Sequence, residues 1–370
     1  MGFRYDIKDT SEIITPQLVY YKDIIIENIK KAIRIAGSDK RLWPHVKSHK
    51  TAEMVKLQME MGIERFKCAT IAEAEMVADC GAGDILLAYP LVGPNIRRFV
   101  SLEKKYPQLR FWAIGEDYGQ LSLLSEESMK GGITTRVLLD VNMGMDRTGV
   151  AIESAEELYE RCASLEGIAM MGFHCYDGNH NDPDLAARKE AVAKKVAVLK
   201  EIQNRLEEKE MECSVFVMGG TPSFPCHAEY PDVFLSPGTA FLQDAGYCRR
   251  LTDLDFIPAA VVVSRVISHP SKRSFTLDLG YKGIAADPVT ERGYIVGGEG
   301  YEAKFQNEEH WVFCLKDGQE TKLPEIGSLV YVIPTHICPT SALYPWILVV
   351  ENGVVKERWE VKARNRKITV

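Results

Sequence analysis

The sequence lacks the features that would place the protein in a membrane or on a nucleic acid. No apolar run approaches the ~20 residues that cross a bilayer, and Met1–Lys8 contains no apolar signal core. Acidic residues outnumber basic ones by 52 to 45, which gives a net charge of −7, and the basic residues are scattered. Because a polyanion-binding surface needs clustered positive charge, we expect a cytoplasmic protein that binds neither membranes nor nucleic acids.

Three other absences narrow the chemistry. No Gly-x-Gly-x-x-Gly motif follows a strand candidate, which argues against dinucleotide binding. The nine cysteines are odd in number and irregularly spaced, so they predict reduced thiols rather than a disulfide framework. No convincing pair of carboxylates at strand ends marks a sugar-processing barrel, which is one rival class of enzyme.

The sequence does contain a long alternation of apolar runs and amphipathic segments, from about residue 17 to 245. Eight apolar strand candidates alternating with helices predict an α/β fold with a closed (β/α)8 TIM-type barrel. An open doubly wound sheet is the alternative. The strand candidates are Leu18–Tyr21, Trp43–Ser48, Arg65–Ala69, Asp84–Tyr89, Leu109–Ile114, Arg136–Asn142, Ile168–Tyr176 and Ser214–Gly219.

After about residue 255 the pattern changes to short β-branched or aromatic runs separated by turns. One of these turns, Glu351-Asn352-Gly353, is typical of a tight hairpin. The sequence therefore predicts a second, C-terminal all-β domain over residues 256–370. The barrel is expected over residues 17–255, and the N-terminal segment 1–16 is expected to pack with the β domain.

A basic string, Trp43-Pro-His-Val-Lys-Ser-His-Lys50, ends the second strand candidate. The carboxyl ends of barrel strands form the active-site mouth, so Lys47 is expected to face a ligand there. A buried lysine loses its proton readily, which Schiff-base formation with an aldehyde cofactor requires. The alternative is a basic strand end that stays in solvent.

Two further segments carry side chains suited to a cofactor. Arg147 lies in a glycine-containing turn, where pairing with Asp146 is the simpler interpretation. Alternation along a strand would place Gly172, His174 and Tyr176 on one face. A glycine followed by two rings suits a planar cofactor lying against the backbone, although packing in an aromatic core is an equal alternative.

Two Gly-Thr pairs follow the last strand of the predicted barrel. They lie in Gly219-Gly-Thr-Pro-Ser223 and Ser236-Pro-Gly-Thr239. Exposed amides and hydroxyls make a suitable cradle for a phosphate, and this part of the barrel is its usual location. Either pair alone could be a simple turn, but both pairs together with Lys47 support a phosphorylated cofactor.

A possible metal pair stands in Pro334-Thr-His336-Ile-Cys338-Pro-Thr340. At i and i+2 of an extended segment, both side chains would leave the same face. Imidazole plus thiolate favours Zn²⁺. A purely structural role is the alternative for this short motif.

Pro44-His-Val-Lys-Ser-His-Lys50 resembles the Pro-His-x-Lys-Thr-His-Lys signature of the D-threonine aldolase/D-serine dehydratase family. Trp43 stands where that family usually has Arg, and Ser48 stands for Thr. The resemblance continues through Phe66–Ala74 and the later motifs, and so covers nearly the whole chain. It implies a fold type III enzyme dependent on pyridoxal 5′-phosphate (PLP), with an alanine racemase-like barrel.

The resemblance also implies a role for each candidate residue. Lys47 would carry PLP, Arg147 would face its phenolic oxygen and Tyr176 would meet its pyridine ring. The phosphate would lie against Gly220, Thr221, Gly238 and Thr239, and a divalent metal, zinc or manganese, would be held by His336 and Cys338. His180 would be a base for the substrate hydroxyl, while Asp278–Lys282 and Glu308–His310 would support the metal site.

By the same resemblance, the expected activity is that of a PLP- and metal-dependent lyase acting on D-3-hydroxy amino acids. Cleavage to glycine and an aldehyde, as in D-threonine aldolase, is preferred. Elimination to a 2-oxo acid and ammonia, as in D-serine dehydratase, is the main alternative, and amino-acid racemisation is a weaker one. A PLP carrier protein would lack the β domain and the metal pair. A homodimer with active sites near the subunit interface is expected.

Overall fold

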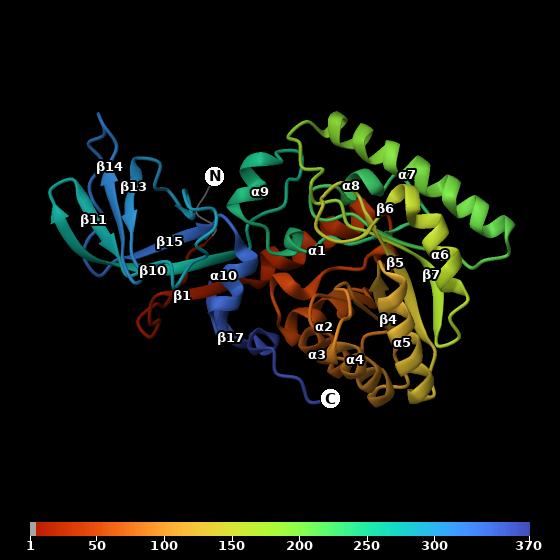
Figure 1. Cartoon of the computed structure of the whole chain (residues 1–370). Helices are drawn as coiled ribbons and strands as arrows, with labels where there is room; N and C mark the ends of the chain where they lie inside the picture. Colours follow the sequence, from red (N-terminus) through yellow and green to blue (C-terminus); the bar gives the residue numbers. More distant parts are fainter. Residues whose placement is uncertain (1–4) are drawn as a thin grey trace. The chain divides into compact units, whose positions relative to one another are not determined.

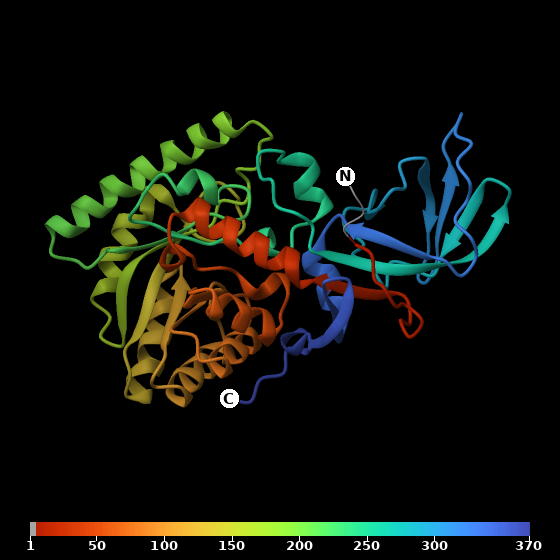
Figure 2. The ribbon, with the colours of Figure 1, turned by 180° about the vertical axis from the view of Figure 1, so that it is seen from behind.

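The computed structural model describes residues 5–370, which form two compact units (Figures 1 and 2). Unit 1 contains the described residues up to Lys31, then Ser48–Lys50 and Thr239–Arg364. Unit 2 contains Ala32–Lys47, Thr51–Gly238 and Asn365–Val370. Each unit is built around its own sheet.

Unit 2 is a barrel of parallel strands with helices on its outside (Figure 1). Its strands pair in the order β2-β3-β4-β5-β7-β8-β9, and β6 pairs with β5. The segment Leu42–His45 lies between β9 and β2 and closes the ring. It makes one bridge to each strand, from Leu42 to Leu235 and from His45 to Lys67. The strands are β2 (Arg65–Cys68), β3 (Asp84–Leu87), β4 (Arg110–Gly115), β5 (Thr135–Asn142), β6 (Val150–Ala151), β7 (Ile168–Cys175), β8 (Val215–Met218) and β9 (Phe234–Leu235).

Most helices of unit 2 link one barrel strand to the next. The helix α1 (Lys22–Ala36) begins in unit 1 and ends in unit 2. The other helices are α2 (Ala52–Glu60), α3 (Ile71–Asp79), α4 (Pro94–Lys105), α5 (Tyr118–Gly131), α6 (Ala155–Ala163), α7 (Leu185–Glu208) and α8 (Phe224–His227). The α/β class and the alanine racemase-like barrel expected from the sequence are confirmed.

Two of the strand candidates take other roles. The first is β1 (Gln17–Tyr21), which pairs antiparallel with β10 and parallel with β16 in the sheet of unit 1. The second, Trp43–Ser48, makes one of the two closing bridges, from His45 to Lys67, and then forms the 3₁₀ turn η2 (Val46–Ser48). Pro44 contributes to this difference because it has no N–H for a strand ladder.

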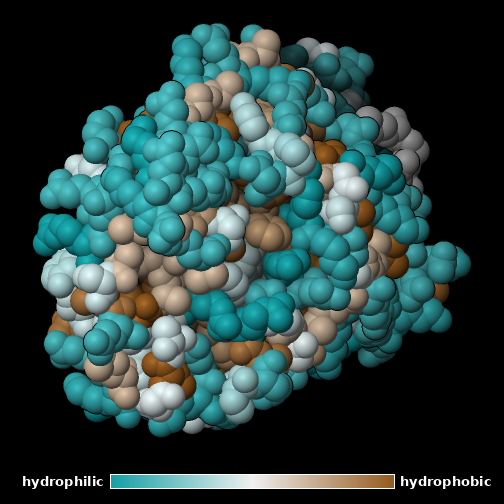
Figure 3. All heavy atoms as spheres, turned by 90° about the vertical axis from the view of Figure 1, so that its right-hand side faces the viewer, coloured by the Kyte–Doolittle hydropathy of each residue, from teal (hydrophilic) through white to brown (hydrophobic). Residues whose placement is uncertain are grey.

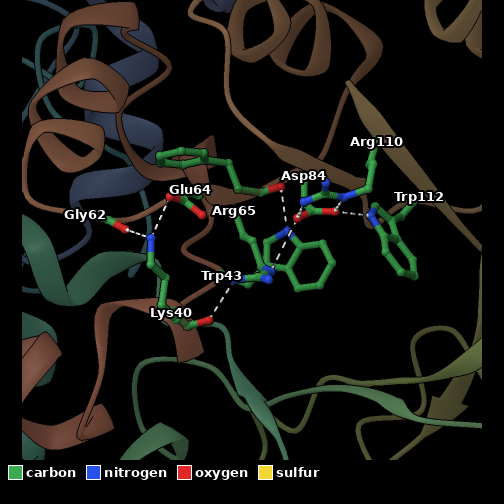
Figure 4. Close-up of polar contacts among 9 residues, drawn as sticks. Lys40, Trp43, Gly62, Glu64, Arg65, Asp84, Arg110 and Trp112 are labelled. Atoms are coloured by element: carbon green, nitrogen blue, oxygen red, sulfur yellow. Dashed lines mark hydrogen bonds and ion pairs between the residues drawn. The ribbon is translucent and has the colours of Figure 1, made fainter. Parts of the chain in front are cut away.

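The interior of the barrel is packed around two tryptophans. Trp43 is 1% exposed, and its ring meets Trp112 edge-to-face with centroids 5.6 Å apart. The indole nitrogen of Trp43 donates to the Phe66 carbonyl at 2.8 Å. Figure 4 shows the neighbouring Asp84, whose carboxylate accepts from Trp112 at 2.8 Å and from Arg110 at 2.6 and 2.7 Å. Trp43 therefore anchors the segment before Lys47, because its apolar ring is buried and its polar atom has a partner.

Unit 1 contains a mixed sheet with the path β13-β14-β11-β10-β1-β16-β17, while β15 pairs with β10 and β12. The expected hairpin at Asn352-Gly353 is present between β16 and β17, with both residues at positive φ. Its remaining strands and helices are β10 (Ala260–Ser271), β11 (Ser274–Leu277), β12 (Gly293–Ile295), β13 (Tyr301–Gln306), β14 (Trp311–Leu315), β15 (Leu329–Pro334), β16 (Trp346–Glu351), β17 (Val354–Glu360), α9 (Ala245–Arg250) and α10 (Ile337–Leu343).

The surface is mixed in character on the face shown in Figure 3, where hydrophilic residues cover most of the area and hydrophobic residues form scattered spots. Within residues 5–370, no helix has both the length and the apolar character needed to cross a bilayer.

Candidate active site

Three cations of unit 2 lie over one aromatic ring, that of Tyr176. The distances to its centroid are 5.6 Å from Lys47 Nζ, 5.5 Å from Lys67 Nζ and 4.7 Å from Arg147 Cζ. Lys47 comes from the η2 turn, Lys67 from β2 and Arg147 from the loop after β5, while Tyr176 directly follows β7. The structure therefore brings Lys47 and Arg147 within cation–π range of Tyr176. The sequence had singled out all three residues as contacts of a planar cofactor.

The loop that carries Arg147 is held by Asn142 at the end of β5. The Asn142 side chain accepts from the amides of Gly144 at 2.9 Å and Asp146 at 3.2 Å, and it donates to the Asp146 carboxylate. Asp146 is therefore bound to Asn142, and Arg147 stacks on Tyr176, in place of the Asp146–Arg147 pairing that was the simpler interpretation.

Glycines fit closely around the Tyr176 ring. A Cβ at Gly178 would lie 2.3 Å from the tyrosine hydroxyl, and one at Gly220 would lie 2.8 Å from the ring. Gly172 has a different role from the one expected, because its Cβ would lie 1.9 Å from the Val215 carbonyl oxygen. The glycine there lets β7 and β8 approach each other.

Two buried carboxylates beside the ring are each held by a histidine. His174 Nδ1 lies 2.6 Å from the Asp140 carboxylate, and His227 Nε2 lies 2.7 Å from the Asp177 carboxylate. Burial opposes the charge of Asp177, but His227 and the Ser223 hydroxyl outweigh it and lower the pKa of this carboxyl. Burial is also the main cause that lowers the pKa of His174. Among the described residues, His174 Nε2 is buried without a hydrogen-bond partner.

Lys67 is a further residue at the Tyr176 ring, and the sequence did not single it out. It is 2% exposed, and burial followed by repulsion from Lys47 lowers its pKa from 10.5 to about 7. A lysine inside a four-residue strand, Arg-Phe-Lys-Cys, gives no signal that separates an inward from an outward side chain. Only the closed ring shows that its ammonium group faces Tyr176.

The two Gly-Thr segments meet each other at the end of the barrel. The Gly238 amide donates to the Thr221 hydroxyl at 3.3 Å, and the Gly220 amide donates to the Ser223 hydroxyl at 3.1 Å. Gly220 and Gly238 are buried, and so is Thr239, which belongs to unit 1. In the described part of the chain, the buried hydroxyl of Ser236 has no partner. This hydroxyl belongs to the second glycine-containing segment, and an anion bound beside the segment would give it a hydrogen-bond partner.

His180 lies in the loop after β7, where its amide donates to the Asp177 carbonyl at 2.9 Å. Its Nε2 atom is buried and has no hydrogen-bond partner within residues 5–370. Burial is the main cause that lowers its pKa, so the imidazole is neutral near pH 7 and able to accept a proton.

The expected metal pair lies in unit 1 with a geometry different from the one predicted. His336 is the N-cap of α10, and Cys338 lies in the first turn of that helix, so the extended i, i+2 arrangement is wrong. Pro339 allows this, because a proline in a first helical turn loses no hydrogen bond. The two side chains still interact, and the thiol also lies 3.3 Å from the Thr239 hydroxyl.

Asp287 supports His336 from a loop that the sequence analysis did not identify. Its carboxylate lies 2.6 Å from His336 Nδ1, which leaves Nε2 as the free ring nitrogen for a ligand. Burial opposes the charge of His336, but Cys338 and Asp287 raise its pKa to about 9. The segments expected to support the metal instead contact one another, since Lys282 pairs with Glu308 and Glu309. Residues 5–370 contain no cluster of three or more His, Cys, Asp or Glu suited to a metal.

The donor set of unit 2 suits PLP. It offers an amine, a guanidinium over the same ring, a cradle with an unpaired hydroxyl, and a histidine nitrogen without a partner. A parallel barrel that carries these groups is typical of the PLP enzymes with an alanine racemase-like barrel. Comparison with known families agrees: the alanine racemase N-terminal domain matches residues 22–244, more than half of the chain, and a putative serine dehydratase domain matches residues 259–350. The chain belongs to the alanine racemase N-terminal domain family, within the fold type III PLP enzymes.

Relatives and solved structures extend the similarity over nearly the full length. The D-threonine aldolase of Arthrobacter sp. is 26% identical over 333 residues, covering 88% of this chain and 86% of that protein. The D-threo-3-hydroxyaspartate dehydratase of Delftia sp. is 22% identical, covering 94% and 96%. The crystal structure of D-threonine aldolase from Filomicrobium marinum has a TM-score of 0.88 and 27% identity, covering 100% of both chains.

Proposed function

We propose that this protein is a PLP- and metal-dependent lyase that cleaves D-3-hydroxy amino acids to glycine and an aldehyde. The observation that carries the proposal is the gathering of Lys47 and Arg147 over the Tyr176 ring in a barrel of this family. The similarity to D-threonine aldolases over nearly the whole chain supports the choice of reaction.

Different residues bind different parts of the cofactor in this proposal. Lys47 supplies the amine for covalent attachment, and Tyr176 supports the ring that Arg147 orients by its positive charge. Gly220, Thr221, Gly238 and Thr239 hold the phosphate through amides and hydroxyls. Bound PLP would withdraw electrons from the α-carbon of the substrate.

Two other groups act on the substrate hydroxyl in this proposal. His180, with its lowered pKa and unpaired Nε2, accepts the hydroxyl proton. His336 and Cys338 hold a divalent metal, zinc or manganese, which would supply Lewis acidity, and Asp287 orients His336.

A dehydratase reaction is the second candidate, and Cys338 is the residue that favours it. By resemblance, a His-x-Cys metal pair is typical of D-serine dehydratases, and here the Cys338 thiol interacts with His336. In that reaction, Lys47 would remove the α-proton and hydroxide would leave the β-carbon. A metal held by His336 and Cys338 would supply Lewis acidity.

A homodimer and a cytoplasmic location complete the proposal. The homodimer, with active sites near the subunit interface, rests on the family resemblance and is tested by light scattering. The reducing compartment is supported by the cysteines, since all nine are free thiols within the described residues.

The experiment that tests the reaction uses the purified protein with PLP and either Zn²⁺ or Mn²⁺. It is incubated with D-threonine, D-serine and D-3-hydroxyaspartate, with the L-enantiomers as controls. Glycine plus an aldehyde identifies the aldolase, and a 2-oxo acid plus ammonia identifies the dehydratase. No product from any D-substrate would overturn both.

Attachment of the cofactor is tested separately by borohydride reduction and peptide mapping. The pyridoxyl group should be found on the peptide that contains Lys47, and Lys47→Ala should trap none. Trapping on Lys50 in the wild type would contradict the assignment.

A further inference from the structure

Lys67 is a second lysine over the Tyr176 ring, and the barrel holds its backbone in place. Its amide donates to the Pro44 carbonyl at 2.8 Å, and its strand pairs with β3 through Leu86. The side chain is 2% exposed, and its nitrogen lies 5.5 Å from the Tyr176 centroid, while Lys47 Nζ lies 5.6 Å from the same point. Within residues 5–370, the ammonium group of Lys67 makes no hydrogen bond or ion pair.

The charges that face Lys67 leave it without a dedicated counter-ion. Lys47 and Arg147 repel it, while Asp140 on β5 and Asp177 after β7 attract it. Each carboxylate binds a histidine, His174 at 2.6 Å and His227 at 2.7 Å, and among the described residues neither forms an ion pair with Lys67. Burial and the two neighbouring cations therefore dominate, and they lower the pKa of Lys67 to about 7.

We propose that Lys67 is a second catalytic lysine, which exchanges a proton with the α-carbon of the bound substrate. This inference rests on the proposed function. Lys47 is assigned to attachment of the cofactor, and Lys67 places a second amine over the same Tyr176 ring. A group that exists in both protonation states near pH 7 can donate and accept a proton efficiently.

The proton transfer balances for the aldolase reaction. Cleavage of the Cα–Cβ bond leaves its electron pair at the α-carbon, while the hydroxyl proton passes to His180 and the aldehyde forms. The ammonium group of Lys67 then gives its proton to the α-carbon, which completes glycine. The resulting neutral amine of Lys67 regains a proton from solvent, and His180 releases its proton to solvent.

The first test measures the protonation of Lys67 without any turnover. Protein labelled with ¹³C at the lysine ε-carbons is titrated by NMR, and the resonance missing from Lys67→Met belongs to Lys67. We expect this resonance to titrate near pH 7 in the apoprotein. Lys56→Met, which removes an exposed lysine of α2, is the control for the assignment. A Lys67 midpoint above about 10 would overturn the proposal.

The second test follows exchange of the α-protons of glycine in D₂O by the holoenzyme, using ¹H NMR. Lys67→Met should slow this exchange at least ~100-fold. Lys67→Arg should slow it similarly, because arginine keeps the charge but cannot release its proton. Both variants should still trap the cofactor on Lys47, and Lys56→Met should behave as the wild type.

Each outcome of the second test decides the role of Lys67. Exchange within about threefold of the wild type in Lys67→Met overturns the proposal, and so does a wild type that does not exchange glycine. Full exchange in Lys67→Arg would also overturn the proposal, because a positive charge at this position would then be sufficient for exchange. If the wild type exchanges glycine but cleaves no hydroxy amino acid, the proposed function fails. The exchange rates of the wild type and Lys67→Met then still show whether Lys67 moves the α-proton.

Discussion

At the scale of single residues, basic side chains gather around Tyr176. Three cations face its ring, while the nearby Asp140 and Asp177 are each bound to a histidine. Like charges held together in a buried place cost stability unless an anion joins them. A cofactor that brings a phosphate and a phenolic oxygen supplies such an anion, so the apoprotein should be less stable than the holoenzyme.

Because Lys67 is buried, we expect the free energy of unfolding to depend on pH. Its pKa is about 7 in the folded protein and 10.5 when unperturbed, so between these values the unfolded chain binds more protons. The free energy of unfolding should therefore gain a contribution from Lys67 as pH rises from about 7. Lys67→Met lacks this contribution and should be the more stable protein at pH 6, with a difference that shrinks towards pH 9.

Urea unfolding of the apoproteins at several pH values measures this difference. Lys56→Met serves as the control, because it removes a lysine from an exposed position on α2. A difference between the wild type and Lys67→Met that stays constant with pH would contradict the prediction.

At the scale of elements, the apolar pattern identified most barrel strands but could not assign each strand to its sheet. β1 is buried along all five residues, as a central barrel strand would be, yet it lies between β10 and β16. β13 was missed because four of its six residues are exposed, which gives no apolar pattern. Partners that come from distant parts of the chain, such as Asp287 for His336, carry no local signal.

The contact between β7 and β8 predicts the effect of a single methyl group. A Cβ at Gly172 would lie 1.9 Å from the Val215 carbonyl oxygen, whereas one at Gly37 would meet nothing within 4 Å. Both glycines have positive φ, 77° at Gly37 and 146° at Gly172, so both substitutions add backbone strain and only Gly172→Ala adds a clash as well. Gly37→Ala should cost about 1 kcal/mol, and Gly172→Ala should cost at least about 2 kcal/mol more.

Chemical denaturation of the two variants, measured side by side, tests this difference. Equal losses in Gly37→Ala and Gly172→Ala would show that the β7–β8 approach is not tight.

At the scale of the whole molecule, each unit has its own buried core, so the fold should not depend on the proposed metal. Two ligands, His336 and Cys338, cannot close a structural zinc site, which needs four. Chelation should therefore abolish turnover and leave the melting temperature within ~2 °C of the untreated holoenzyme. Zn²⁺ or Mn²⁺ should restore activity.

Variants at the same pair provide the control for chelation. Cys338→Asp should shift the preference from the softer towards the harder ion. Full activity in a His336→Ala, Cys338→Ala double variant would refute a catalytic metal and favour racemisation.

Unit 1 is assembled from both ends of the chain, and this has a consequence for synthesis. The strand β1 leaves the ribosome early, but its partners begin at Ala260 and Trp346. At the usual translation speed, β1 waits about 10 to 50 s for β10 and longer for β16. During that interval its five residues, four of them apolar or aromatic and all buried in the finished protein, are exposed while the barrel is being completed. The nascent chain should therefore engage chaperones through residues 17–21 until β10 emerges.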